Sequence, residues 1–150
     1  MSAGATPSQT VGPFFSIGLV REGESVAAPD GVHIRGTVYD GDGAPVPDAL
    51  LEFWQVSPRE LFARGSCEPG EGDYEIVTLV PGGEQPWIDV SVFARGMLNR
   101  VVTRIYFVPD DVPDFVPAER RATLIAHDDG DGYRFDIRLQ GPTETVFFDV

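Results

Sequence analysis

Apolar and polar residues alternate along much of this 150-residue chain, most clearly in residues 86–107. Two runs in that stretch, 87–94 and 101–107, place an apolar side chain at every second position, with Thr103 as the one exception, which is the repeat of a β-strand with two different faces. The pair Arg95-Gly96 stands between the runs and is typical of a turn. We therefore expect a hairpin in which two apolar strands hold the cation of Arg95.

The same period of two predicts further strands, at residues 32–38, 49–56, 74–80, 133–140 and 144–150. Residues 57–73 are rich in glycine, proline and glutamate and are expected to form an irregular surface loop. Residues 117–125 carry the only helical spacing of apolar positions. About seven to eight short strands, one short helix and frequent turn signals predict an all-β fold, an antiparallel β-sandwich.

Residues 1–30 show no sustained periodicity and contain several glycines and prolines. We expect an extended N-terminal arm, followed by one domain in residues 31–150 that is long enough to bury its own core. Within the arm, residues 6–15 combine turn formers with two aromatic side chains, which indicates a segment that packs on another surface. An ordinary docked terminus is the competing interpretation.

Charge and composition narrow the functional classes. Eleven basic against 24 acidic residues give a net charge of −13, which disfavours binding to nucleic acid or to an anionic membrane. No apolar run approaches the ~20 residues of a membrane span, and the N-terminus lacks the basic and apolar blocks of a signal peptide. The single cysteine, Cys67, cannot form an intramolecular disulfide. We therefore expect a soluble, cytoplasmic protein.

Candidate chemistry is sparse in the residues themselves. The chain has no glycine-rich phosphate loop, no G-x-S-x-G motif and no histidine beside a candidate nucleophile. We interpret His33 and His127 as surface residues and Cys67 as an incidental thiol, and this set is too small for a zinc cluster. The aspartate-rich stretches 40–43 and 128–132 lack the final glutamate of a calcium loop and are expected to be turns. These residues alone predict a β-sandwich with an interaction surface.

Seven motifs are spread over nearly the whole chain, at residues 6–15, 36–43, 51–55, 92–96, 103–107, 120–126 and 133–149. Together they resemble the intradiol ring-cleavage dioxygenases, in particular the alpha type of subunit in the members that act on protocatechuate. Only residues 57–85 form a shorter segment than this family leads us to expect. The resemblance implies one subunit of a hetero-oligomeric enzyme, inactive alone.

In this family a non-haem Fe³⁺ ion is bound by two tyrosines and by the histidines of a His-x-His pair. The resemblance places Trp87 and Asp89 at the histidine positions, Phe62 at one tyrosine position and the tyrosine-free segment 81–86 at the other. An indole cannot bind ferric ion, and one carboxylate is too little. The resemblance therefore implies no metal and no catalytic residue on this chain, with Fe³⁺ on an iron-binding beta subunit as its partner.

The resemblance also implies a set of substrate-binding residues. Thr10, Gly12, Pro13 and Phe14 of the arm, with Arg95 of the hairpin, would wall a cavity for a small aromatic acid and O₂. Small residues let a backbone approach a planar ring closely, and a guanidinium matches a carboxylate. The family usually carries tyrosine where Phe14 stands. The implied reaction is cleavage of protocatechuate between its hydroxylated carbons to 3-carboxy-cis,cis-muconate.

Other interpretations stay open at this stage. Arg95 can serve in a surface or interface ion pair instead of a substrate contact. The chain can be a free-standing β-sandwich binding module, which the arm permits. It can also be an interaction protein that has kept the subunit fold without a role at an active site, which the shortened segment 57–85 and Phe14 permit.

Overall fold

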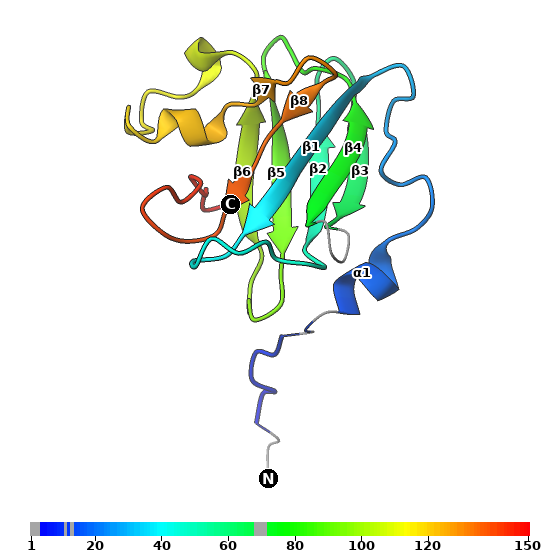
Figure 1. Ribbon diagram of the computed structural model, residues 1–150, viewed down its shortest axis with the longest axis vertical. Helices are drawn as coiled ribbons and strands as arrows, with labels where there is room; N and C mark the ends of the chain where they lie inside the picture. Colours follow the sequence, from blue (N-terminus) through cyan, green and yellow to red (C-terminus); the bar gives the residue numbers. More distant parts are fainter. Residues whose placement is uncertain (1–3, 11, 13, 68–71) are drawn as a thin grey trace.

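The computed structural model of the protein describes residues 4–10, 12, 14–67 and 72–150. Two β-sheets pack face to face (Figure 1). The β2 sheet has the order β3-β2-β5-β6, with β2 (Leu50–Gln55), β3 (Leu61–Ser66), β5 (Trp87–Phe93) and β6 (Val101–Tyr106). The β1 sheet has the order β4-β1-β8-β7 with β9 also beside β1, and comprises β1 (Val32–Tyr39), β4 (Asp73–Thr78), β7 (His127–Asp128), β8 (Tyr133–Arg134) and β9 (Ile137–Arg138). The predicted all-β sandwich is confirmed.

The hairpin predicted around Arg95 is confirmed as β5 and β6, which pair antiparallel. The amide of Met97 donates to the carbonyl of Ala94 at 3.2 Å across the turn. Gly96 has a φ of +81°, a left-handed conformation that glycine adopts without steric cost. The turn therefore depends on the backbone of Gly96, and it determines where Arg95 leaves the sheet.

The main core lies between the two sheets. Every second residue of β5 is buried, as the alternation predicts. Both sheets contribute to one apolar cluster, whose fully buried members include Ile34, Ile76, Ile88, Val90 and Ile105. Burial of each such side chain stabilises the fold by about 1.5–3 kcal/mol.

The outer side of β6 carries a second, smaller apolar cluster. Tyr106 is buried there by the chain between β6 and β7, which contributes Val112, Val116 and Leu124. This connecting segment lies beside β6 as the yellow and orange part of Figure 1 and contains two 3-10 turns, η1 (Pro109–Asp111) and η2 (Arg121–Leu124). Both faces of β6 are therefore covered, which the period of two did not predict.

The helix predicted at residues 117–125 is wrong in type and extent, since only η2 is helical there. The hydroxyl of Thr123 donates to the carbonyl of Arg120 at 2.8 Å and accepts the amide of Val146 at 3.2 Å. The turn is therefore stabilised by its contact with the C-terminal segment, and not by the repeated hydrogen bonds of a longer helix. The one α-helix in the described residues, α1 (Phe14–Leu19), lies in the arm. No helix in the described part of the chain has the length and apolar character to span a membrane.

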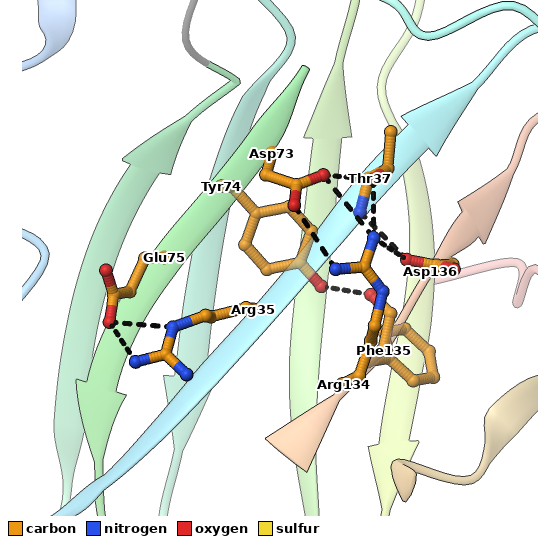
Figure 2. A network of polar contacts seen from close by, with 8 residues as sticks. All are labelled: Arg35, Thr37, Asp73, Tyr74, Glu75, Arg134, Phe135 and Asp136. Carbon is orange, nitrogen blue, oxygen red and sulfur yellow. Dashed lines mark hydrogen bonds and ion pairs between the residues drawn. The ribbon is translucent and has the colours of Figure 1, made fainter. Parts of the chain in front are cut away.

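The β1 sheet is mixed, whereas the sequence predicted antiparallel pairing throughout. β1 pairs antiparallel with β4 but parallel with β8 and β9. The strand predicted over residues 133–140 is interrupted at Asp136, whose carboxylate accepts the amide of Thr37 at 3.0 Å. Arg134 contacts Asp73 at 3.2 Å and Asp136 at 3.0 Å, so one guanidinium ties β8 to β4 across β1 (Figure 2). Side-chain bonds therefore complete this part of the sheet.

The loop predicted at residues 57–73 is wrong in its middle. β3 lies there and pairs antiparallel with β2. Its inward residues Ala63 and Gly65 are buried, and Cys67, which was expected in the loop, is buried as well. Because the inward positions of β3 carry small residues, they give only a weak apolar signal in the sequence.

The strand predicted at residues 144–150 is not formed, although the structure describes this whole segment. The amide of Phe148 donates to the carbonyl of Val102 at 2.8 Å, and the hydroxyl of Thr103 donates to the carbonyl of Val146 at 2.8 Å. One backbone bond and one side-chain bond to β6 do not make the repeated ladder of a strand. The C-terminal segment is therefore docked on the sandwich without extending a sheet.

The N-terminal arm has a docked part and an exposed part. The amide of Val77 donates to the carbonyl of Ser25 at 2.8 Å, and that of Arg64 donates to the carbonyl of Glu24 at 2.9 Å. The docked part thus covers one edge strand of each sheet, β4 and β3, which would otherwise present unpaired backbone groups. Residues 4–10 are exposed and lie beyond the end of the sandwich in Figure 1. The domain boundary at residue 30 stays a prediction.

Candidate functional site

Arg95 lies at the turn of the β5–β6 hairpin and forms an ion pair with Asp48. Its Nε donates to Oδ1 of Asp48 at 3.3 Å, and its Nη2 donates to Oδ2. The Asp48 side chain is 8% exposed and that of Arg95 is 52% exposed. The hydrogen bond with Asp48 raises the pKa of Arg95. The buried carboxylate of Asp48 thus fixes the position of a permanent cation, Arg95, at the surface. The Arg95 side chain itself remains about half exposed to solvent.

A pocket of about 490 Å³ opens beside this ion pair. Much of its wall is apolar, with contributions from Val46, Met97, Val101, Leu139 and Phe147. Among the described residues that line it, Arg95 is the only basic one, while Asp40 and Glu144 are acidic. The volume suits a small organic ligand. Any anionic group of such a ligand would have to bind at Arg95, because the acidic residues repel it.

The arm approaches the same hairpin. Gln9 lines a hollow of about 250 Å³ together with Phe93, Ala94 and Met97. Ala94 and Met97 also line the pocket beside Arg95. The structure therefore brings the arm close to the turn that carries the predicted substrate-binding arginine.

Thr10, Gly12 and Phe14, the predicted arm residues that the structure describes, are not among the residues that line the pocket beside Arg95. The amide of Gly12 donates to the hydroxyl of Thr10 at 3.4 Å, so these two residues contact each other. Phe14 is 62% exposed at the start of α1, and Pro13 lies outside the described residues. Among the described residues, the hydrogen bonds of Arg95 run to Asp48. Within this described part of the chain, no hydrogen bond joins Arg95 to the predicted arm residues.

Three positions that the resemblance relates to metal ligands lie together on the outer face of the β2 sheet. Phe62 and Asp89 are both neighbours of Trp54 in the strand register, and Trp87 precedes Asp89 by two residues on β5. These side chains face away from the core, because the intervening residues of β5 are buried. The rings of Trp54 and Phe62 lie 4.6 Å apart. This face is thus largely aromatic at the ligand positions.

A guanidinium occupies this face. Nε of Arg104 donates to Oδ1 of Asp89 at 2.9 Å, and Cζ of Arg104 lies 4.6 Å from the ring centre of Trp87 and 4.7 Å from that of Phe148. The indole N–H of Trp87 donates to Oδ2 of Asp89 at 3.3 Å. The carboxylate is therefore already neutralised, and the cation that neutralises it is stacked between two aromatic rings.

The residues on this face do not fit a ferric ion. Phe62 and Trp87 offer no donor atom for Fe³⁺, and Asp89 is bound to Arg104, whose charge repels a second cation. The nearby Tyr106 is buried, and this burial raises the pKa of its phenol, which disfavours a phenolate ligand. No group of three or more His, Cys, Asp or Glu within the described ranges is placed to hold a metal ion.

The other candidate groups have local structural roles. Oδ1 of Asp40 accepts the amides of Asp42 and Ala44, each at 2.9 Å, and the loop after β7 is likewise a turn, so the aspartate-rich stretches are turns as predicted. His33 is exposed and its Nδ1 lies 2.5 Å from Oε1 of Glu75, which lowers the pKa of Glu75. His127 is exposed as well. The prediction of surface histidines is confirmed.

Sequence reasoning missed Asp48 and Arg104. Asp48 belongs to no motif, and its importance lies in a contact with Arg95, 47 positions later in the chain. Arg104 had a usable signal, because a hairpin that turns at Gly96 places residue 104 opposite Asp89. That register would have predicted the ion pair on the outer face of the sheet.

No protein-family model matches this chain. Solved structures share its fold, among them hydroxyquinol 1,2-dioxygenase from Pseudomonas putida DLL-E4, with a TM-score of 0.58 and 21% identity over 92% of this chain and 67% of that one. An intradiol ring-cleavage dioxygenase from Tetranychus urticae gives a TM-score of 0.51 and 16% identity over 81% of this chain and 88% of that one. The fold is therefore that of the intradiol dioxygenases.

The curated relatives are more specific. The chain is 41% identical to the protocatechuate 3,4-dioxygenase alpha chain of Burkholderia cepacia, with 97% of both chains covered, and 35% identical to that of Pseudomonas putida, with 96% of both covered. It is 29% identical to the beta chain from Burkholderia cepacia over 84% of this chain and 70% of that one. The chain belongs to the family of protocatechuate 3,4-dioxygenase alpha chains. The first alignment extends over 191 positions, more than the 150 residues present here, so this chain lacks segments that its relative has.

Proposed function

We propose that this chain is the non-iron subunit that completes the active-site cavity of an intradiol dioxygenase, in which protocatechuate is cleaved by O₂ to 3-carboxy-cis,cis-muconate. The likeness to alpha chains over 97% of both sequences supports this role. The observation that carries it is the guanidinium of Arg104, stacked and paired at the ligand positions of the family. Such a chain needs a partner for the chemistry of the metal.

The proposed partner is the iron-binding beta subunit, in an alpha–beta oligomer. The relatives are named as alpha and beta chains of one enzyme, which supports a division of labour between two related subunits. Iron on the partner would activate the bound catechol ring toward O₂. This chain would bind and orient the ring and exclude water from it.

In this proposal the arm, residues 1–30, contacts the partner. Phe14 and Ile17 of α1 are 62% and 77% exposed. Neighbouring apolar side chains of that size on a short helix are typical of a surface that another chain covers. The passage of Gln9 along the β5–β6 hairpin supports a position of the arm next to Arg95.

The arm also supplies one wall of the proposed substrate cavity. Thr10, Gly12, Pro13 and Phe14 would line it, and glycine allows the backbone to approach a flat ring closely. Phe14 would contribute apolar contact only, because it has no hydroxyl to donate. Discrimination between polar substituents of the ring would then depend on other residues.

Arg95 is the proposed binding group for the carboxylate of the substrate. One edge of its guanidinium is bound to Asp48, and 52% exposure of the side chain leaves the rest accessible. Paired N–H···O bonds between guanidinium and carboxylate are strong and directional. Arg95 would therefore favour a catechol ring that carries a carboxylate over one that does not.

We also infer that the protein acts in the cytoplasm. A chain with a single cysteine, Cys67, cannot close an intramolecular disulfide. A fold that needs no disulfide is compatible with a reducing compartment, where disulfides are rare.

Expression with and without the beta chain tests the proposal. We expect iron content and O₂ uptake on protocatechuate in the complex, and neither in the chain purified alone. Stoichiometric iron or turnover in the isolated chain would refute the division of labour. A soluble monomer that never co-purifies with the beta chain would instead favour a free-standing binding module.

A further inference from the structure

Asp48 lies two residues before the start of β2, in an unusual backbone conformation. Its φ is +66°, and no other described residue except glycines has a positive φ. Aspartate tolerates this left-handed region better than most residues, yet glycine adopts it without steric cost. Strained backbone conformations are often found where the side chain has a specific task. The aspartate at this position therefore needs an explanation in terms of its carboxylate.

The carboxylate of Asp48 is bound to Arg95 through both of its oxygens. Only 8% of the Asp48 side chain is exposed, and a buried carboxylate is tolerated when it is paired with a cation. The amide of Asp48 also donates to the carbonyl of Cys67 at 3.2 Å, just beyond the end of β3. Asp48 is therefore the fixed member of the pair, and Arg95 is the member that would move without it.

This pairing decides which N–H groups of Arg95 remain available. A guanidinium has five N–H donors arranged along two usable edges, and Asp48 takes the edge formed by Nε and Nη2. The other edge of the guanidinium is not bound to Asp48, and the Arg95 side chain lines the pocket of about 490 Å³. An arginine on an exposed turn would otherwise sample many rotamers, so Asp48 presents the same edge each time a ligand arrives.

We propose that Asp48 is the positioning residue that orients Arg95 toward the carboxylate of the substrate. This inference rests on the proposed function, because Asp48 has this role only if Arg95 binds that carboxylate. The negative charge of Asp48 also opposes an anionic substrate. Arg95 is half exposed, however, and solvent screens charges that do not touch, so orientation outweighs repulsion.

The variant Asp48→Asn tests the role in the alpha–beta complex. Asparagine has the same shape and tolerates a positive φ, but its NH₂ group faces the donors of Arg95 and replaces one accepting oxygen. We expect the KM for protocatechuate to rise about three- to tenfold, since an arginine that is no longer immobilised must be ordered on binding. We expect kcat to stay unchanged, and the KM for catechol, which lacks the carboxylate, to stay within about twofold.

Two further variants make the result unambiguous. Asp114→Asn removes a carboxylate from an exposed ion pair with Arg121 at 2.9 Å and should change neither KM. Arg95→Ala tests the underlying function, because equal effects on the two substrates would refute the carboxylate role of Arg95 itself. A selective effect of Arg95→Ala without one of Asp48→Asn would overturn only the role of Asp48.

The remaining outcomes are also decisive. A lower KM for protocatechuate in Asp48→Asn would show that Asp48 acts only through its charge and would overturn the inference. If Asp48→Asn does not assemble, Asp48→Gly takes its place, because glycine suits the backbone at this position. Loss of assembly in both variants would assign Asp48 to folding and would likewise overturn the positioning role.

Discussion

Arg104 shows how one side chain can determine what a face of a β-sheet is able to bind. It neutralises Asp89 at 2.9 Å and lies between the rings of Trp87 and Phe148. The resemblance implied that these positions hold no metal, because an indole cannot bind ferric ion and one carboxylate is too little. The register of the hairpin would have indicated the ion pair of Arg104 with Asp89, but no local pattern indicates the stacking on Phe148, 44 positions later in the chain.

Arg104→Ala should lower the free energy of unfolding by about 1–3 kcal/mol. The substitution leaves the carboxylate of Asp89 without its cation and removes the stacking contact that holds Phe148 near β6. Urea denaturation of the purified chain measures the change. Arg35→Ala is the control, because it breaks more exposed pairs with Glu75 and Asp131 and should cost less than about 1 kcal/mol. Equal losses in the two variants would contradict the special role of Arg104.

The β5–β6 hairpin was the element most fully predictable from the sequence. Two clean alternations and an Arg-Gly turn identify it locally, and the structure places both strands and the positive φ of Gly96 accordingly. Elements that depend on distant contacts were not predictable in this way. β3 has small inward residues, and the break between β8 and β9 depends on a bond from the amide of Thr37 to Asp136.

Gly96→Ala should destabilise the hairpin by about 1–2 kcal/mol, because a Cβ at φ +81° is strained even though open space surrounds it. Gly82→Ala is the matched control, since Gly82 also has open space around its Cβ position and lacks a positive φ. Urea denaturation of the two variants separates strain from the mere addition of a methyl group. A loss in Gly82→Ala as large as that in Gly96→Ala would show that the turn does not depend on the glycine conformation.

At the scale of the whole molecule, the sandwich and its arm differ in how far the sequence predicts them. The sandwich is specified by alternation along single strands, so its class was predictable from the sequence alone. The candidate site was predictable only in part, because Thr10, Gly12 and Phe14 come from the arm and Arg95 from the β5–β6 hairpin, and among the described residues no hydrogen bond joins the two. In the proposed function a partner chain would supply the rest of this site, and a contact between two chains leaves no pattern in one sequence.

Removal of residues 1–18 should leave the sandwich as stable as before, because the described hydrogen bonds from the arm to the sandwich begin at Leu19. Removal of residues 1–28 should lower the urea midpoint, since it also strips the bonds of Glu24 and Ser25 from the edges of β3 and β4. In the alpha–beta complex, the shorter deletion should raise the KM for protocatechuate and for catechol alike, because the arm is proposed to contact the ring and not the carboxylate. Unchanged kinetics on both substrates would exclude residues 1–18 from the cavity wall. A selective loss with protocatechuate would mean that the arm, and not Arg95, recognises the carboxylate.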